Sequence, residues 1–290
     1  MSAIPMNAAE LPVAVAQFTV ARESERNLEM IDAFAKDAAA DGARLLVLPE
    51  GLIARDGDDD SFAASHAQPI DGSFVAGLRR ISRMRHIVLM GTVHVASSDQ
   101  KTVRDEAGVA CEAGADQRVS NVFLVIREGE IAAAYRKLHL YDAFAAKESE
   151  VVCRGDELPP IVAIDGWHIG VMTCYDVRFP ETARSLAVRG ADVIVVSAAW
   201  VRGPHKEYHW KLLTAARAVE NTCYVLACSE VSKRNIGCSR IINPMGEVIV
   251  EAGDDTATII TAKLSHESLE SARQILPVLE NRRFADPRLR

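Results

Sequence analysis

The residues around Cys174 have the types and spacing expected of a nucleophile at the end of a strand. The apolar run over residues 169–172 predicts a buried strand, and Pro180 predicts the first turn of a helix. A side chain at such a corner stands above the sheet edge, where backbone N–H groups favour negative charge. This setting would lower the pKa of a thiol and offer a place for an oxyanion. The alternative is a buried cysteine with a packing role only.

Two other segments place ionisable side chains at strand ends. A second apolar strand, predicted over residues 45–48, is stopped by proline, and Glu50 follows at once. On an extended segment Lys137 and His139 lie on the same face. Taken alone, each of these residues is typical of a solvated surface charge.

Together and in this order, the three segments resemble the nitrilase, or carbon–nitrogen hydrolase, superfamily. That family uses a Glu–Lys–Cys triad in strand-Pro-Glu, Arg-Lys-x-His-Leu and Cys-Tyr-Asp-x-Arg-Phe-Pro-Glu motifs. The matching residues are Glu50, Lys137 and Cys174, and a second family glutamate matches Glu148. The resemblance covers residues 13–284, and three ordered motifs make a chance match improbable.

Within the superfamily, the sequence is similar to the bacterial deaminated glutathione amidases. The similarity lies in residues 137–146, 198–206, 208–210 and 276–284. Those enzymes cleave the amide of the α-keto derivative of glutathione, which gives 2-oxoglutarate and cysteinylglycine as a metabolite repair. The ω-amidases, which act on 2-oxoglutaramate, form a neighbouring branch that lacks the Trp-Val-Arg-Gly-Pro segment.

The resemblance implies a role for each polar residue and requires no cofactor. Cys174 attacks the amide, and Glu50 takes its proton, passes it to the leaving amine and then activates water. This shuttle works best if partial burial raises the pKa of Glu50 toward neutrality. Lys137 and the backbone N–H of Tyr175 hold the oxyanion. Glu148 orients Lys137 or the attacking water, unless it is a surface charge.

Other functions remain open from the residues. A Cys–His pair, as in papain-like enzymes, would use His139, but it leaves Glu50 and Lys137 without roles, so we expect His139 to bind a neighbouring carboxylate or backbone group. An ω-amidase or another small-amide hydrolase is the second enzymatic hypothesis. A non-enzymatic binding or scaffold protein is the third, and it has no need of an intact triad.

The implied substrate carries two carboxylates, so arginine or lysine should lie near the pocket. We expect Arg178 to be structural and paired with a carboxylate. The candidates for substrate binding, charged or aromatic, are Arg55, Tyr141, Phe144, Trp200, Arg202 and Lys206.

Composition excludes several classes of protein. The 290 residues are 49% hydrophobic with a net charge of −7 and no basic stripe, so we expect no nucleic-acid partner. No apolar run reaches the ~18 residues of a membrane span, and residues 1–10 predict a loose tail rather than a secretory signal. The six cysteines contain no CxxC pair and indicate reduced thiols in the cytoplasm. His205 and His209 have metal-binding spacing but no third ligand nearby, so we expect no metal site.

Helical patterns over residues 27–40, 73–84, 180–188 and 206–220 alternate with apolar strands, which predicts α/β layers. Periodicity alone also allows a doubly wound sheet. The resemblance implies a four-layer αββα sandwich of two sheets, with residues 11–290 as one carbon–nitrogen hydrolase domain. It also implies a homodimer or larger homo-oligomer that uses residues 185–190 and 276–284. Residues 97–117 predict an enlarged polar loop.

Overall fold

The computed structural model describes residues 9–59, 61–96, 118–144, 146–254, 256–285 and 287–289 of the chain. The predicted polar loop at 97–117 and residues 1–8 of the predicted tail lie outside this range. Glu10 already belongs to the first strand, so the predicted tail ends before Glu10.

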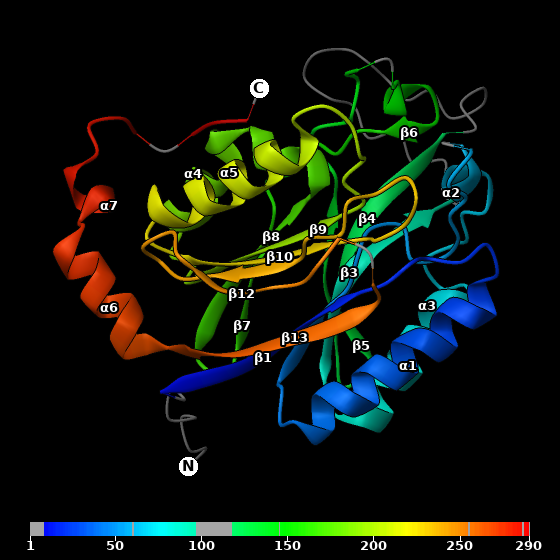
Figure 1. Cartoon of the computed structure of the whole chain (residues 1–290), viewed down its shortest axis with the longest axis horizontal. Helices are drawn as coiled ribbons and strands as arrows, with labels where there is room; N and C mark the ends of the chain where they lie inside the picture. The colour runs from blue at the N-terminus through cyan, green and yellow to red at the C-terminus, as the bar shows by residue number, and fades with distance from the viewer. Residues whose placement is uncertain are drawn as a thin grey trace.

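The first sheet has the strand order β13-β1-β2-β3-β4-β5, with β6 paired to β4. Strands β1, β2 and β3 run parallel, whereas β4, β5 and β13 join them in antiparallel pairs. The strands are β1 (Glu10–Gln17), β2 (Leu45–Val47), β3 (Val88–Val95), β4 (Val119–Arg127), β5 (Glu130–Arg136), β6 (Val152–Cys153) and β13 (Thr258–Ser265). Helices α1 (Ser24–Ala40) and α3 (Ser73–Arg85) cover its outer face (Figure 1).

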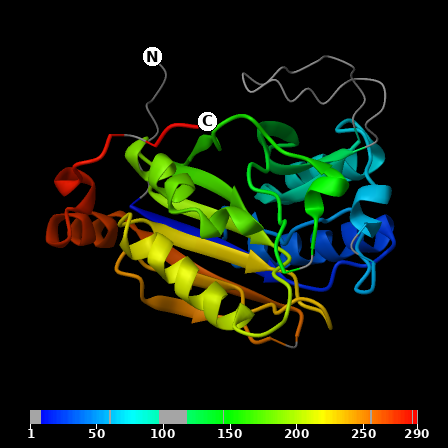
Figure 2. The same cartoon turned by 90° about the horizontal axis from the view of Figure 1, so that it is seen from above.

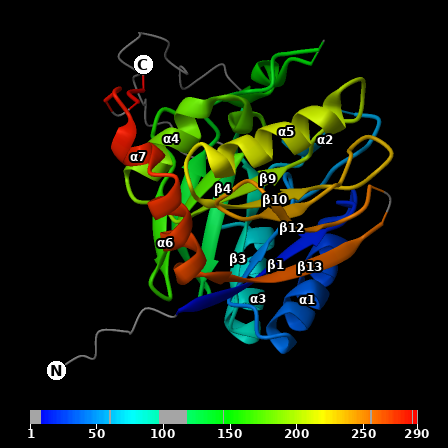
Figure 3. The ribbon, with the colours of Figure 1, turned by 60° about the vertical axis from the view of Figure 1, so that its left-hand side comes forward.

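The second sheet has the order β12-β11-β10-β9-β8-β7, and its central strands β8, β9 and β10 run parallel. The strands are β7 (Ile161–Ile164), β8 (Trp167–Thr173), β9 (Val193–Ala198), β10 (Tyr224–Ser229), β11 (Arg240–Ile242) and β12 (Val248–Glu251). Helices α4 (Pro180–Val188) and α5 (Lys206–Val219) lie on its outer face (Figure 2). Helices α6 (His266–Ile275) and α7 (Val278–Asn281) follow β13 at one end of the molecule (Figure 3).

Alternating side chains build the layers. In β1, Val13 and Val15 pack between the sheets, whereas Ala14 and Ala16 face the helical layer. The same alternation in β8 and β9 places Val171 in the central core. Both sheets therefore bury two faces, and the predicted αββα sandwich is confirmed in place of a single doubly wound sheet.

The two sheets are joined by hydrogen bonds at the edge where β2 and β9 end. The Ser197 hydroxyl donates to the Leu48 carbonyl at 2.9 Å, and the Glu50 N–H donates to the Ala198 carbonyl at 3.2 Å. This edge carries the polar side chains that the sequence singles out. None of the described helices is long and apolar enough to cross a membrane.

Candidate active site

Cys174 lies at a tight corner between β8 and a short 3-10 helix over Cys174–Arg178. Its φ angle is +44°, in the left-handed region that non-glycine residues adopt at an energetic cost, which is a frequent property of functional positions. Only 8% of the residue is exposed. Helix α4 then begins at Pro180, as predicted.

Buried Asp176 holds this corner in place. Its carboxylate accepts hydrogen bonds from the Thr173 N–H at 2.9 Å and from the Tyr135 hydroxyl at 2.8 Å. It also bonds both the backbone N–H and the Nδ1 atom of His139, at 3.1 and 2.7 Å. The corner that presents the thiol is therefore fixed from β5 and β8 together.

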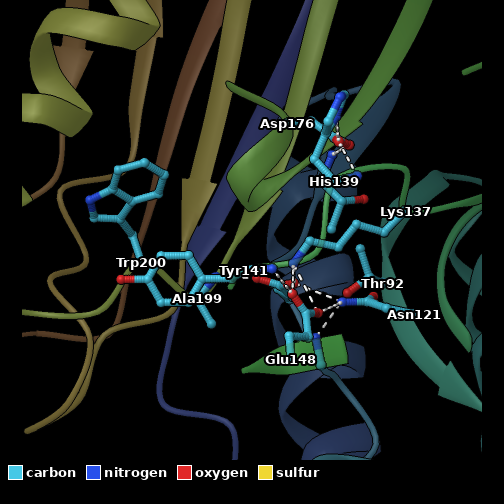
Figure 4. A network of polar contacts seen from close by, with 12 residues as sticks. Thr92, Asn121, Lys137, His139, Tyr141, Glu148, Asp176, Ala199 and Trp200 are labelled. Carbon is cyan, nitrogen blue, oxygen red and sulfur yellow. Dashed lines mark hydrogen bonds and ion pairs between the residues drawn. The ribbon is translucent and has the colours of Figure 1, made fainter. Parts of the chain in front are cut away.

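His139 helps to hold this corner in place and does not act as a base for the Cys174 thiol. Its ring stacks on Phe179 with a centroid separation of 3.7 Å, and its Nδ1 faces Asp176. Figure 4 shows the contacts of His139 with Asp176 apart from those of Lys137 with Glu148. The expected structural role of His139 thus agrees with its contacts, and these contacts leave no basis for a Cys–His pair.

Lys137 lies between two carboxylates. Its Nζ is 3.1 Å from Oε1 of Glu50 and 2.8 Å from Oε2 of Glu148, and only 2% of the side chain is exposed (Figure 4). The backbone just after β5 is fixed too, because the Lys137 N–H donates to Asn121 O and the Gly155 N–H donates to Lys137 O. The ammonium group therefore has little freedom to move.

Both glutamates have fixed orientations. Oε2 of Glu50 accepts from the Ala199 N–H at 2.8 Å, and Oε1 accepts from Asn121 Nδ2 at 2.8 Å. Oε2 of Glu148 accepts from the Tyr141 N–H at 2.7 Å. Glu148, with 16% of its side chain exposed, is therefore bonded into this network, and the alternative of a free surface charge is wrong.

The electrostatics differ from the sequence expectation. Burial opposes ionisation of Glu50, but the charges of Lys137 and Arg55 outweigh it and hold the pKa of this carboxyl well below its usual range. Burial and the Glu50 carboxylate raise the pKa of the Cys174 thiol well above its usual value. Burial disfavours the charged form of Lys137, yet Glu148 and Glu50 raise its pKa. The expectations of a lowered thiol pKa and a raised Glu50 pKa are both wrong, because burial dominates at the thiol, whereas the nearby cations outweigh burial at Glu50.

The site therefore favours the neutral thiol of Cys174 and the ionised carboxylate of Glu50. It adjoins a cavity of about 350 Å³. The lining includes Glu50, Lys137, Glu148, Cys174 and Tyr175, together with four of the predicted substrate residues, Arg55, Tyr141, Trp200 and Lys206.

Two predicted substrate residues do not line this cavity. Arg202 binds the Ser232 carbonyl at 3.1 Å and Asp254, because the chain after β9 pairs with the loop before β11 and turns the guanidinium outward. Phe144 is 67% exposed, and the Nζ of Lys206 lies 4.0 Å from the centroid of its ring. The structure thus contradicts cavity contact for Arg202.

Arg178 does not form the ion pair with a carboxylate that the sequence predicts. Its guanidinium lies over the rings of Trp200 and Tyr175, at 4.9 and 5.9 Å from their centroids. No carboxylate among the described residues pairs with it. The aromatic faces supply a cation–π contact in place of the salt bridge.

The sequence motifs did not identify three polar residues of the site. Asn121 is 1% exposed and donates to Glu50, and Thr92 accepts from the Gly51 N–H at 2.9 Å. His94 lines the cavity opposite Asn121 in the β3–β4 ladder, where burial and the charge of Arg55 lower its pKa to about 4. The available signal was a polar side chain inside an otherwise apolar strand, which in a buried strand needs a partner.

Among the described residues, no group of three or more His, Cys, Asp or Glu side chains could hold a metal ion. The ring centroids of His205 and His209 are 6.2 Å apart, and the Nδ1 of His209 faces Arg178 at 3.4 Å.

Known proteins resemble this chain in sequence and in fold. The carbon–nitrogen hydrolase family model matches residues 12–274. A deaminated glutathione amidase from Escherichia coli O157:H7 is 42% identical over 277 residues, which cover 96% of this chain and 99% of the relative. A superfamily protein from Xanthomonas campestris, solved with an arsenic adduct in its active site, has a TM-score of 0.78 at 25% identity and covers 95% of this chain and 98% of its own. An amidase from Nesterenkonia, with a TM-score of 0.76 at 24% identity and 97% coverage of both chains, shares the fold.

Proposed function

Because the chain belongs to the carbon–nitrogen hydrolase family, we propose that it is an amidase that hydrolyses deaminated glutathione to 2-oxoglutarate and cysteinylglycine. The observation that carries this proposal is the buried Glu50–Lys137–Glu148 network at the wall of the cavity that Cys174 also lines. The substrate follows from the 42% identity, over nearly the full length of both proteins, with an amidase of that name.

Acylation begins with a neutral thiol beside an ionised carboxylate. Cys174 passes its proton to Glu50 as the sulfur attacks the amide carbon, so the total charge of the buried site does not change. A free thiolate would add a negative charge beside Glu50 and Glu148, and burial together with the Glu50 carboxylate already raises the pKa of this thiol. We therefore propose that proton transfer accompanies attack instead of preceding it.

The tetrahedral oxyanion would be held by Lys137 and by the N–H of Tyr175, which lies in the first turn after Cys174 and needs no intrahelical acceptor. Glu50 then gives its proton to the leaving amine, the C–N bond breaks and a thioester remains on Cys174. Water, with its proton taken by Glu50, hydrolyses the thioester and restores the thiol. Glu148 holds Lys137 in place through two contacts, at 3.0 and 2.8 Å.

The direct test measures release of 2-oxoglutarate from deaminated glutathione by the purified protein and by Cys174→Ala. We expect release by the parent protein and none by the variant, with both folded as judged by thermal unfolding. Retained turnover in Cys174→Ala would overturn the thiol mechanism. Parallel rates with 2-oxoglutaramate separate this function from an ω-amidase, which would prefer the simpler amide.

We further propose a cytoplasmic homodimer. Four described cysteines, Cys174, Cys223, Cys228 and Cys238, are buried free thiols, which suits a reducing compartment. The C-terminal segment exposes Ile275 and Phe284, by 73% and 89%, and such apolar side chains are available for a partner surface. Mass measurement in solution tests the dimer, and a monomer across the working concentration range would contradict it.

A further inference from the structure

Lys206, which begins α5, and Arg55, which lies on the loop after β2, both line the cavity. Neither has a carboxylate within ion-pair distance among the described residues. A buried or half-buried cation without a counter-ion is unfavourable in a folded protein. Such groups become favourable when a ligand supplies the missing negative charge.

Lys206 lies on the Cys174–Tyr175 side of the cavity. Only 5% of the residue is exposed, and its Nζ donates to the Tyr141 hydroxyl and lies 4.6 Å from the centroid of that ring. The Tyr141 ring in turn meets Tyr175 edge-on at 5.1 Å, next to the nucleophile. Burial lowers the pKa of Lys206, in accord with an ammonium group that has no ionic partner.

Arg55 lies on the Glu50 side. Its guanidinium folds back over Gly51, where a Cβ would meet Arg55 Nη1 at 2.7 Å, and Gly51 directly follows Glu50 in the chain. The charge of Arg55 lowers the pKa of Glu50 and of His94. The pKa of Lys206 is instead influenced by Arg178 and Cys174. The two cations therefore belong to separate parts of one cavity.

We propose that this cavity recognises a dianionic amide by both ends, with Lys206 binding a carboxylate on the acyl side and Arg55 binding a carboxylate on the leaving amine. The inference rests on the proposed amidase function and adds the charge pattern of its substrate.

The assignment of ends follows from the direction of the reaction. The leaving amine must take its proton from Glu50, so the leaving group lies toward Glu50 and Arg55. The acyl chain stays on Cys174 as a thioester and must extend the other way, toward Tyr141 and Lys206. A substrate with one carboxylate beyond each side of the scissile amide would satisfy both cations, and charge-assisted hydrogen bonds of this kind are among the stronger polar contacts.

The test uses three matched amides and two variants. The amides are deaminated glutathione, its C-terminal glycinamide without the leaving-side charge, and butyryl-cysteinylglycine without the acyl-side charge. The variants are Lys206→Met and Arg55→Met. Arg202→Met is the control, because it removes a nearby cation that binds Asp254 outside the cavity lining.

We expect Lys206→Met to lower kcat/KM about 10- to 100-fold for deaminated glutathione and for its glycinamide, and far less for the butyryl amide. Arg55→Met should show the reverse pattern, with the large loss on the two substrates that carry the leaving-side carboxylate. Equal losses on all three amides, or a loss in Arg55→Met that appears only as a shifted pH profile, would overturn the inference. The second outcome would assign Arg55 to the ionisation of Glu50 alone.

Failure of the inference is distinguishable from failure of the proposed function. If the parent protein does not release 2-oxoglutarate from deaminated glutathione, the function fails, and the glycinamide and butyryl amides still report on charge selectivity. If the parent protein is active and both variants lose activity without regard to substrate charge, the function stands and the two-ended recognition is wrong. Alkylation of Cys174 by iodoacetamide in each variant verifies that the nucleophile remains in place.

Discussion

The Nζ of Lys137 and the Oε1 of Glu50 lie 3.1 Å apart in the protein interior, although β3 and β4 separate the strands that precede them. Glu50 is also bonded to Ala199 of the other sheet, so the ion pair ties β2 and β5 to the end of β9. Each charge compensates the other where the two side chains are only 2% and 6% exposed. Removing one partner therefore affects folding as well as chemistry.

Lys137→Met should destabilise the protein by about 3–5 kcal/mol, because the buried carboxylate of Glu50 and the half-buried carboxylate of Glu148 both lose their ammonium partner. Urea unfolding measures this loss. The double variant Lys137→Met/Glu148→Gln removes one of the stranded charges and should recover part of the stability without recovering hydrolysis. If the double variant were less stable than Lys137→Met, Glu148 would not carry an uncompensated negative charge in the single variant.

Glu50→Gln should abolish turnover and lower the pKa of Cys174. The amide keeps an oxygen for the Ala199 N–H but cannot accept the thiol proton, and it removes the negative charge that disfavours a thiolate. Lys137 then acts on the thiol with less opposition. The pH dependence of iodoacetamide alkylation at Cys174 should shift to lower pH in the variant, and an unchanged or higher midpoint would contradict the role of Glu50 in raising the thiol pKa.

His139→Phe should reduce activity only modestly, by about tenfold. Phenylalanine keeps a ring to stack on Phe179 but loses the bond from Nδ1 to Asp176, so the corner at Cys174 is held less firmly. Loss of a general base would cost 10²- to 10⁴-fold, as general acid–base groups typically contribute. The size of the loss in kcat thus separates support of the corner from a Cys–His pair.

The sequence predicted the elements and the triad better than it predicted their electrostatics. The Pro180 helix and the two sheets follow from local patterns and from the resemblance. The ionisation of Glu50 depends on Lys137 and Arg55, which come from other segments, so neither its pKa nor that of Cys174 is a local property. Arg202 and Lys206 looked equivalent because they follow the same strand, yet Arg202 binds Asp254 outside the cavity lining.

Acid should remove part of the stability that Glu50 contributes. Its pKa is lower in the folded protein than its usual value of 4.5, so the unfolded chain binds the proton more readily. The contribution is therefore present above about pH 4.5 and decreases as pH falls toward the folded-state pKa. The stability difference between the parent protein and Glu50→Gln, measured by urea unfolding, should narrow between pH 6 and pH 3. A difference that widens in acid would mean that the pKa of Glu50 is raised, and not lowered, in the folded protein.

Gly51→Ala should separate the position of Arg55 from its charge. Gly51 has a φ of +78°, which alanine adopts at a cost of about 1–2 kcal/mol, and the new methyl group would lie 2.7 Å from Arg55 Nη1. The guanidinium must then move while it keeps its charge. We expect a small drop in melting temperature and a loss of kcat/KM on substrates with a leaving-side carboxylate, in the same direction as Arg55→Met.

Gly42→Ala is the matched control, because it has a similar φ of +82° and no atom within 4 Å of the added carbon. It should therefore reproduce the loss of stability without the change in substrate selectivity, and an equal change in both variants would mean that strain, and not the position of Arg55, governs the effect.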